Sequence, residues 1–243
     1  MLLPAVAWAI PTSGFTATVE FDGNSEVFNE TMLGCTSTGT DTFNCIGGAA
    51  NGDPSVASPG GYDYQLDTWN MNLDVDPIVN GVIGVTNLSN STQTFTLTVF
   101  LPVAPLGPTT LMGGSMQGGV TDNNGDGATL STVAASAYYM GLIDGLPVGA
   151  PAVLYPDPPG NVTAAGPFLS NNVPAASFGT PIPSAAGPAV ANSIGIKFQF
   201  DLSAHDSATF TGVFVVEPIP EPVTATLLGF GLVGLAIASR RRV

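Results

Sequence analysis

The amino-acid sequence predicts an all-β protein: an antiparallel β-sandwich or jelly-roll-like ectodomain followed by a C-terminal single transmembrane helix. Of its 243 residues, 44% are hydrophobic and 9% charged, so the chain can bury a core and does not have a disordered composition. Lys and Arg total only 4, whereas Gly, Pro, Thr and Val are plentiful, which favours strands joined by turns. Several segments also alternate apolar and polar residues, the period of half-buried strands.

The expected strands follow from this alternation. An early strand, "FTATVEF", covers residues 15–21, and "WNMNLDVDP" predicts a second over residues 69–77. Residues 81–103 indicate a strand, a polar turn and a strand, and residues 193–218 indicate a hairpin that turns at "SAHDSA". The residues expected on buried faces are Trp69, Met71, Leu73, Val75, Phe95, Leu97, Val99, Leu101, Ile194, Ile196, Phe198, Phe200 and Leu202.

The segment 145–190 differs from the rest, because ten of the 21 prolines fall within it, among Ala, Gly and Ser. Proline removes a backbone donor, so we expect long loops or extended edge segments here rather than core strands. We place one exported β-sandwich domain at residues 10–217, with this Pro/Gly-rich segment inside it.

The charge distribution excludes one class of partner. The formal net charge is −14, and Arg240, Arg241 and Arg242 are three of the four cations, so the rest of the chain sets Lys197 against 18 acids. Such a surface repels phosphate, and we expect no nucleic-acid binding.

Cys35 and Cys45 are the only cysteines, in the Gly/Thr-rich stretch "GCTSTGTDTFNCIGG". In an oxidising compartment we expect them to close a small loop as a disulfide. The alternative is two unrelated buried thiols, and a metal site lacks further ligands nearby.

"TDNNGDG" places Asp122, Asn124 and Asp126 at alternate positions before Gly127, like the first half of a calcium loop. The twelfth position is Val133 rather than a bidentate Glu, so the stretch is no EF-hand. The alternatives are a calcium-assisted turn and a plain β-hairpin turn rich in residues that accept positive φ.

Three further groups of residues carry side chains that could do chemistry. Asp74 and Asp76 lie two residues apart on an expected strand, so both side chains point to the same face. They could form a carboxylate pair that binds a cation or acts in acid–base chemistry, or they could belong to a solvated strand face. His205, the single histidine, is expected in a turn with no catalytic partner. Aromatic residues are expected mainly in the core, with a sugar-stacking platform as the minority alternative; they are Tyr62, Tyr64, Trp69, Tyr138 and Tyr139.

The two ends carry targeting features. At the N-terminus, Ala7-Trp8-Ala9 after an apolar run predicts a truncated signal peptide at residues 1–9. At the C-terminus, residues 223–239 are uncharged and about long enough for a short membrane span. Arg240, Arg241 and Arg242 then act as the stop-transfer cluster and keep the rest of the chain outside.

Pro220-Glu221-Pro222 stands directly before the apolar segment and must remain extended. This motif, the apolar helix and the Arg cluster together resemble the C-terminal sorting signal of PEP-CTERM proteins, over residues 218–243. The resemblance implies recognition by an exosortase at the inner membrane of a Gram-negative bacterium that makes exopolysaccharide. It also implies an inner-membrane-anchored precursor with a periplasmic ectodomain, cleaved for the cell surface or extracellular space.

From these features we expect a non-enzymatic surface or extracellular-matrix protein with a structural or adhesive role. Its expected partners are an exosortase, the inner membrane as a transient anchor, and exopolysaccharide. The alternative is a calcium-assisted carbohydrate-binding module, and a glycan-active enzyme ranks third because no local motif supplies facing carboxylates. No cofactor other than calcium is indicated.

Overall fold

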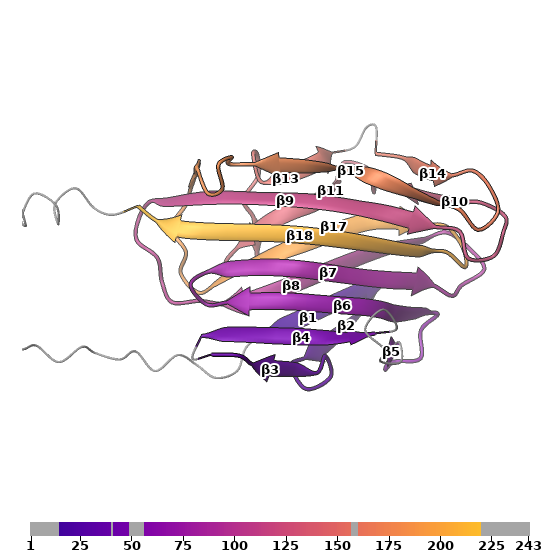
Figure 1. The fold of residues 1–243 in the computed structure, drawn as a ribbon, viewed down its shortest axis with the longest axis horizontal. Helices are drawn as coiled ribbons and strands as arrows, with labels where there is room; N and C mark the ends of the chain where they lie inside the picture. The colour runs from indigo at the N-terminus through magenta and orange to yellow at the C-terminus, as the bar shows by residue number, and fades with distance from the viewer. Residues whose placement is uncertain (1–14, 40, 49–55, 157–159, 220–243) are drawn as a thin grey trace, which may run out of the picture.

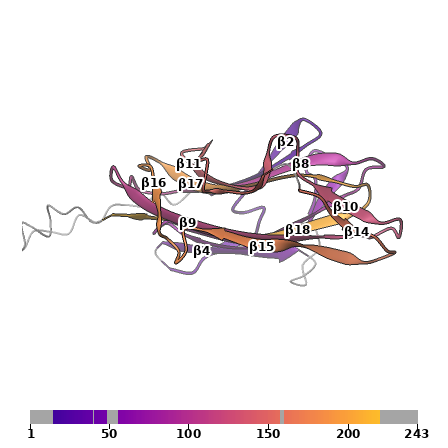
Figure 2. The ribbon, with the colours of Figure 1, turned by 90° about the horizontal axis from the view of Figure 1, so that it is seen from above.

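The computed structural model describes residues 15–39, 41–48, 56–156 and 160–219, and all regular elements in these ranges are β-strands. They form two antiparallel sheets that pack face to face, which Figure 1 shows from one face and Figure 2 along the layers. The all-β, sandwich-like fold expected from composition and alternation is confirmed. The expected transmembrane helix and signal peptide lie outside the described residues.

Sheet A runs in the order β12-β11-β17-β8-β1-β2, with β10, β13 and β14 attached at its margin. Its strands are β1 (Thr16–Phe21), β2 (Asn24–Asn29), β8 (Gln93–Pro102), β10 (Ala128–Ser131), β11 (Ala137–Ile143), β12 (Leu146–Pro147), β13 (Val153–Pro156), β14 (Val162–Ala164) and β17 (Ser193–Leu202).

Sheet B runs in the order β15-β9-β18-β7-β6-β4-β3, with β16 paired to β9 and β5 to β6. Its strands are β3 (Cys35–Ser37), β4 (Thr42–Gly48), β5 (Val56–Ala57), β6 (Tyr64–Asp74), β7 (Ile78–Asn87), β9 (Thr110–Thr121), β15 (Ser170–Phe178), β16 (Ala185–Gly187) and β18 (Ser207–Pro218).

The predicted inward faces form the core. In β8 and β17 the apolar residues at every second position are buried, and on β8 the intervening Thr96 and Thr98 are buried as well. The two strands pair along ten positions, from Ser193 opposite Pro102 to Leu202 opposite Gln93. All the expected core residues of these strands are buried, as are Trp69, Met71 and Leu73 on β6. Val75 lies just beyond β6 and is half-buried.

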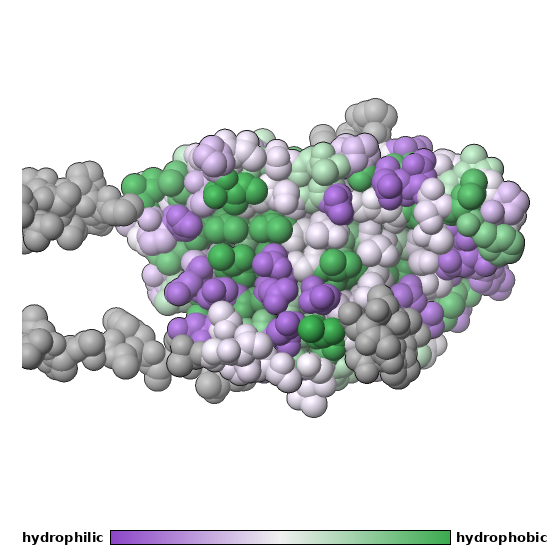
Figure 3. Space-filling view, in the orientation of Figure 1, coloured by the Kyte–Doolittle hydropathy of each residue, from purple (hydrophilic) through white to green (hydrophobic). Residues whose placement is uncertain are grey.

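Aromatic rings fill the space between the sheets. Phe210 of β18 lies 4.8 Å from Phe200 and 5.0 Å from Phe198 of β17, measured between ring centroids. Tyr138 of β11 adds a third contact to Phe210, at 5.9 Å. The outer face of sheet B, by contrast, mixes hydrophobic and hydrophilic residues (Figure 3).

The expected hairpin at residues 193–218 is wrong. β17 belongs to sheet A and β18 to sheet B, so residues 203–206 cross between the sheets. Residues 88–92, between β7 and β8, cross in the same way. Each strand pairs with non-consecutive neighbours instead: β17 with β8 and β11, and β18 with β7 and β9. A polar turn between alternating strands fits both arrangements, because the alternation fixes the buried face and not the hydrogen-bonding partner.

The Pro/Gly-rich segment 145–190 contributes only β12 to β16, which are attached at the margins of the sheets. β15, an outermost strand of sheet B, has an irregular register between Val173 and Ala176, around Pro174. The prediction that this segment forms extended edge segments is therefore confirmed. Proline suits an edge, because its missing N–H would otherwise interrupt a ladder.

Candidate functional site

Three loops that cross between the sheets meet at one end of the sandwich, the right-hand end in Figure 1. They are residues 88–92, 122–127 and 203–206. The side-chain amide of Asn87 donates to the carbonyl oxygens of Leu202 and Ser203, each at 3.0 Å, and of Ser91 at 2.9 Å. Two of the loops, 88–92 and 203–206, are thus held together by a buried amide at the end of β7.

Asp122 organises the loop 122–127. Its Oδ1 accepts the backbone N–H groups of Asn124 (3.2 Å) and Gly125 (2.8 Å), and its Oδ2 accepts those of Gly127 (3.2 Å) and Phe168 (2.9 Å). Gly125 and Gly127 have φ of 90° and 96°, a conformation that glycine adopts without steric cost. The loop is therefore wound around one carboxylate, and it links β9 to β10 across the sheets rather than closing the β-hairpin that was weighed.

The pKa of Asp122 is held below its ordinary value of 3.8. Burial of the side chain, which is 1% exposed, acts to raise the pKa, but the four backbone N–H donors outweigh it because they stabilise the charged form. Asp122 is accordingly an anion throughout the neutral range.

Asp206 joins this loop from a distant part of the chain. Its side chain is fully buried, Oδ1 accepts the N–H of Asn123 (3.2 Å), and Oδ2 accepts the hydroxyl of Ser203. Burial raises the pKa of Asp206, and the negative charges of Asp122 and Asp126 raise it further, against the two hydrogen bonds.

The carboxylates of Asp122, Asp126 and Asp206 converge, with one oxygen of each within 4.8 Å of the others. Two of the three predicted calcium ligands are therefore brought together. The third, Asn124, is exposed, and its Oδ1 accepts the N–H of Asp126 (3.1 Å) inside the loop. Sequence reasoning missed Asp206, because its contact with the loop arises only when two inter-sheet crossings meet.

A converging set of carboxylate oxygens is the donor type that Ca²⁺ prefers, at 2.3–2.6 Å from six to eight oxygens. The three carboxylates also repel one another when they are charged, and this repulsion adds to the effect of burial in raising the pKa of Asp206. The arrangement can bind a hard cation or share a proton.

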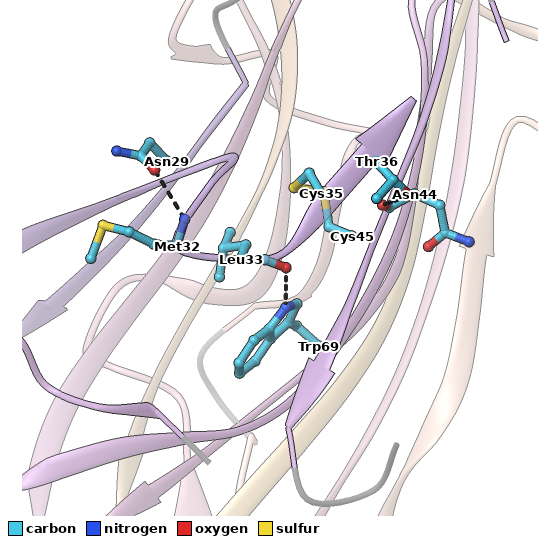
Figure 4. The surroundings of a disulfide bond; sticks show 8 residues. All are labelled: Asn29, Met32, Leu33, Cys35, Thr36, Asn44, Cys45 and Trp69. Carbon is cyan, nitrogen blue, oxygen red and sulfur yellow. Dashed lines mark hydrogen bonds between the residues drawn. A yellow bond between two sulfur atoms is a disulfide. The ribbon is translucent and has the colours of Figure 1, made fainter. Parts of the chain in front are cut away.

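Cys35 and Cys45 form a disulfide, with an S–S distance of 1.99 Å (Figure 4). They lie directly opposite each other on the paired strands β3 and β4. Beside them the indole N–H of Trp69 donates to the carbonyl of Leu33 at 2.7 Å, so the outermost part of sheet B is anchored to the core by a covalent bond and a buried hydrogen bond.

Two of the weighed alternatives are wrong. Asp76 is not on the strand with Asp74 but in the following turn, where its N–H donates to Oδ1 of Asp74 (3.0 Å), so the two residues form a turn rather than a carboxylate pair. The aromatic platform is also absent from the described surface, because four of its five members are buried in the core; these are Tyr64, Trp69, Tyr138 and Tyr139.

His205 lies in the turn before β18, as expected, and its Nε2 is 3.0 Å from Oδ1 of Asn90. It therefore joins two of the crossing loops.

The sorting motif and the Arg cluster lie outside the described residues, which end at Ile219. Just before them, β18 ends at Pro218, and the N–H of Ile219 still donates to the carbonyl of Thr109 at 3.2 Å. Ordered sheet pairing thus continues to the residue that precedes Pro220-Glu221-Pro222. No helix in the described part of the chain has the length and hydrophobicity needed to cross a membrane.

No protein-family model matches this chain, and no curated protein matches it in sequence.

Proposed function

We propose that this chain is an exported, non-enzymatic protein of the cell surface or extracellular matrix, sorted and cleaved by an exosortase. The observation that carries the proposal is the tail: Pro220-Glu221-Pro222, an uncharged segment at residues 223–239, and Arg240 to Arg242. The segment forms a single transmembrane helix that anchors the precursor transiently in the inner membrane, with the β-sandwich on the periplasmic side.

The folded domain supports this role in two ways. A cross-strand disulfide is typical of proteins that mature in an oxidising compartment. The domain also ends where the motif begins, because β18 pairs up to Pro218 and the motif starts at Pro220. A protease that cuts near Glu221 would find an extended substrate and would leave the sheet intact.

The course of β18 supports one orientation of the domain in the proposed precursor. β18 lies inside sheet B and is about 36 Å long at roughly 3.3 Å per residue. It runs from Ser207, beside the acidic loops at the right-hand end of Figure 1, to Pro218 at the opposite end of the sandwich. In the anchored precursor the acidic cluster therefore faces away from the membrane and its anionic headgroups.

The test is the intact mass of the protein in each cell fraction of a Gram-negative host that makes an exosortase. We expect a product that ends near Glu221, outside the inner membrane, and 2 Da lighter than the reduced form because of the disulfide. Replacing Pro220, Glu221 and Pro222 by Ala should leave full-length protein in the inner membrane. The matched control Glu217→Gln changes an exposed acid just upstream and should be processed normally. A wild-type chain that ends at Val243 and is found only in the inner membrane would refute the proposal.

A second candidate function is a calcium-assisted carbohydrate-binding module, and the convergence of Asp206 with Asp122 and Asp126 favours its calcium component. Neutralising three close carboxylates would remove their repulsion and fix three loops at the membrane-distal end. At 100 times its dissociation constant, bound Ca²⁺ would contribute about 2.7 kcal/mol.

We therefore expect calcium to raise the melting temperature by about 5–10 °C, measured by thermal unfolding with calcium or with chelator. Asp206→Asn should abolish the gain, whereas Asp76→Asn, an exposed acid in a turn of sheet B, should retain it. Equal gains in both variants would contradict a site at this cluster.

Without calcium, we expect Asp206→Asn to stabilise the protein rather than to destabilise it. Because the pKa of Asp206 is raised in the folded state, its contribution to stability falls as the pH rises from about 4 through that raised pKa. Asp206→Asn should therefore be more stable than the wild type in chelator at pH 7.5, and the difference should shrink toward pH 4. A variant that is less stable than the wild type with calcium but more stable in chelator has lost a calcium ligand, whereas a generally damaged fold would be less stable in both conditions.

A further inference from the structure

A groove crosses the outer face of sheet A. It consists of two adjoining hollows of about 410 and 300 Å³ that share Glu20 and Thr96 in their lining. The turn between β1 and β2 borders one hollow and the turn between β11 and β12 borders the other. Figure 2 shows β2 rising away from the plane of its neighbours, on the side of this outer face.

The register of three strands assembles the floor. Thr96 of β8 lies between Glu20 of β1 and Gln199 of β17, and in the next row Thr98 lies between Thr18 and Lys197. These residues alternate with the inward-facing core positions of the same strands, so they share the outward face, where Thr96 and Thr98 are only 5% and 8% exposed. The floor is thus built from hydroxyl, amide, carboxylate and ammonium groups on rigid strands.

Lys197 is the only Lys or Arg among the residues that the structure describes. It is half-buried, yet its ammonium group forms no ion pair or hydrogen bond with any described residue, in a chain of 18 acids. A partly desolvated ammonium without a partner is unfavourable. An ammonium that gains hydrogen-bond acceptors only from a ligand can serve as a binding group, because it offers three donors.

An apolar surface stands at one end of the groove. Phe100 is half-buried and lies across from Gly195, where a Cβ would come within 3.2 Å of the ring. The glycine leaves the ring room to lie on the sheet, next to Leu142 in the groove lining. Aromatic rings in such positions pack against the C–H faces of sugar rings.

We propose that this groove binds a neutral polysaccharide chain. A polyanion would meet Glu20 and the protein's net charge of −14, and a cationic ligand would meet Lys197. Sugar hydroxyls both donate and accept, so they satisfy Glu20, Lys197 and Gln199 together. The groove is open at its surface and runs across strands, which suits an extended chain rather than a small enclosed ligand.

A polysaccharide ligand gives the proposed surface role a specific binding partner. The biological setting of this inference rests on that proposed function. Its test is independent of sorting, because it uses the purified full-length chain before any cleavage. It is also independent of the calcium candidate, because the groove residues and the Asp122 cluster belong to separate surfaces and the assay is run in chelator.

The experiment measures binding of the full chain, in a detergent without a sugar headgroup, to soluble polysaccharides. The probes are a β-1,3-glucan, a β-1,4-glucomannan and an α-1,6-glucan, with alginate as the polyuronate. We expect at least one neutral polymer to bind, and Lys197→Met and Glu20→Gln each to weaken that binding by tenfold or more. Phe100→Leu, which removes the ring but keeps an apolar side chain, should weaken it by threefold or more.

Glu217→Gln is the matched control, since it makes the same change as Glu20→Gln at an exposed site on sheet B, and it should bind as the wild type does. Melting temperatures within about 2 °C of the wild type would show that the groove variants are folded. Binding of alginate alone, binding that the groove variants leave unchanged, or no binding to any of the neutral polymers would each overturn the proposal.

Discussion

Asp122→Ala is expected to lower the free energy of unfolding by about 3–5 kcal/mol. The substitution removes the acceptor for four backbone N–H groups in and beside the loop 122–127. Hydrogen bonds to a charged group contribute roughly 1.5–3 kcal/mol each, although donors that become exposed to water recover part of that. The loss can be measured by urea denaturation followed through the fluorescence of Trp69, which is buried in the core.

Two controls sharpen this result. Asp63→Ala removes an exposed carboxylate outside the crossing loops and should change stability by less than about 0.5 kcal/mol. Asp122→Asn keeps one acceptor oxygen, so its loss in the free energy of unfolding should lie between the losses of Asp122→Ala and Asp63→Ala. A loss for Asp122→Ala no larger than that for Asp63→Ala would show that the loop does not depend on this carboxylate.

Asp122 should also make the stability of the protein depend on pH in the acidic range. Since the folded-state pKa of Asp122 is below 3.8, its stabilisation is fully present above pH 3.8 and is lost as the pH falls through the lower folded value. The wild type should therefore lose more stability than Asp122→Ala on acidification below about pH 4. Parallel pH curves for the two proteins would contradict a lowered pKa.

Phe210→Ala is expected to destabilise the protein by about 3–5 kcal/mol, the range for removing a buried Phe. Phe210 is fully buried, and its ring is the meeting point of Phe198, Phe200 and Tyr138. Because Phe210 belongs to sheet B and the other three to sheet A, the cavity would open in the layer that joins the sheets.

Urea denaturation measures this effect as well, with Phe168→Ala as the control because that ring is 68% exposed. The control should lose less than about 1 kcal/mol. A loss below about 1.5 kcal/mol for Phe210→Ala would mean that the two sheets do not share the core described above.

Much of this protein could be predicted from its sequence. The alternation in residues 93–102 and 193–202 identifies the buried face of β8 and β17 residue by residue, because side chains on a strand alternate between two environments. The prolines of 145–190 place that segment at the margins of the sheets, because proline cannot donate to a ladder. The sorting tail is likewise a local pattern, complete within residues 218–243.

Only the tertiary structure decided which strands pair and which distant residues meet. Backbone hydrogen bonds are the same for every residue, so alternation cannot tell a hairpin from a crossing between sheets. For this reason β17 and β18 were expected to pair, and the convergence of Asp206 with Asp122 was not foreseen. The groove that joins Glu20, Lys197 and Phe100 has the same origin, since its parts come from three strands placed side by side by core packing. Local sequence determines which face of a strand is buried, and the packing of the whole chain determines what lies beside it.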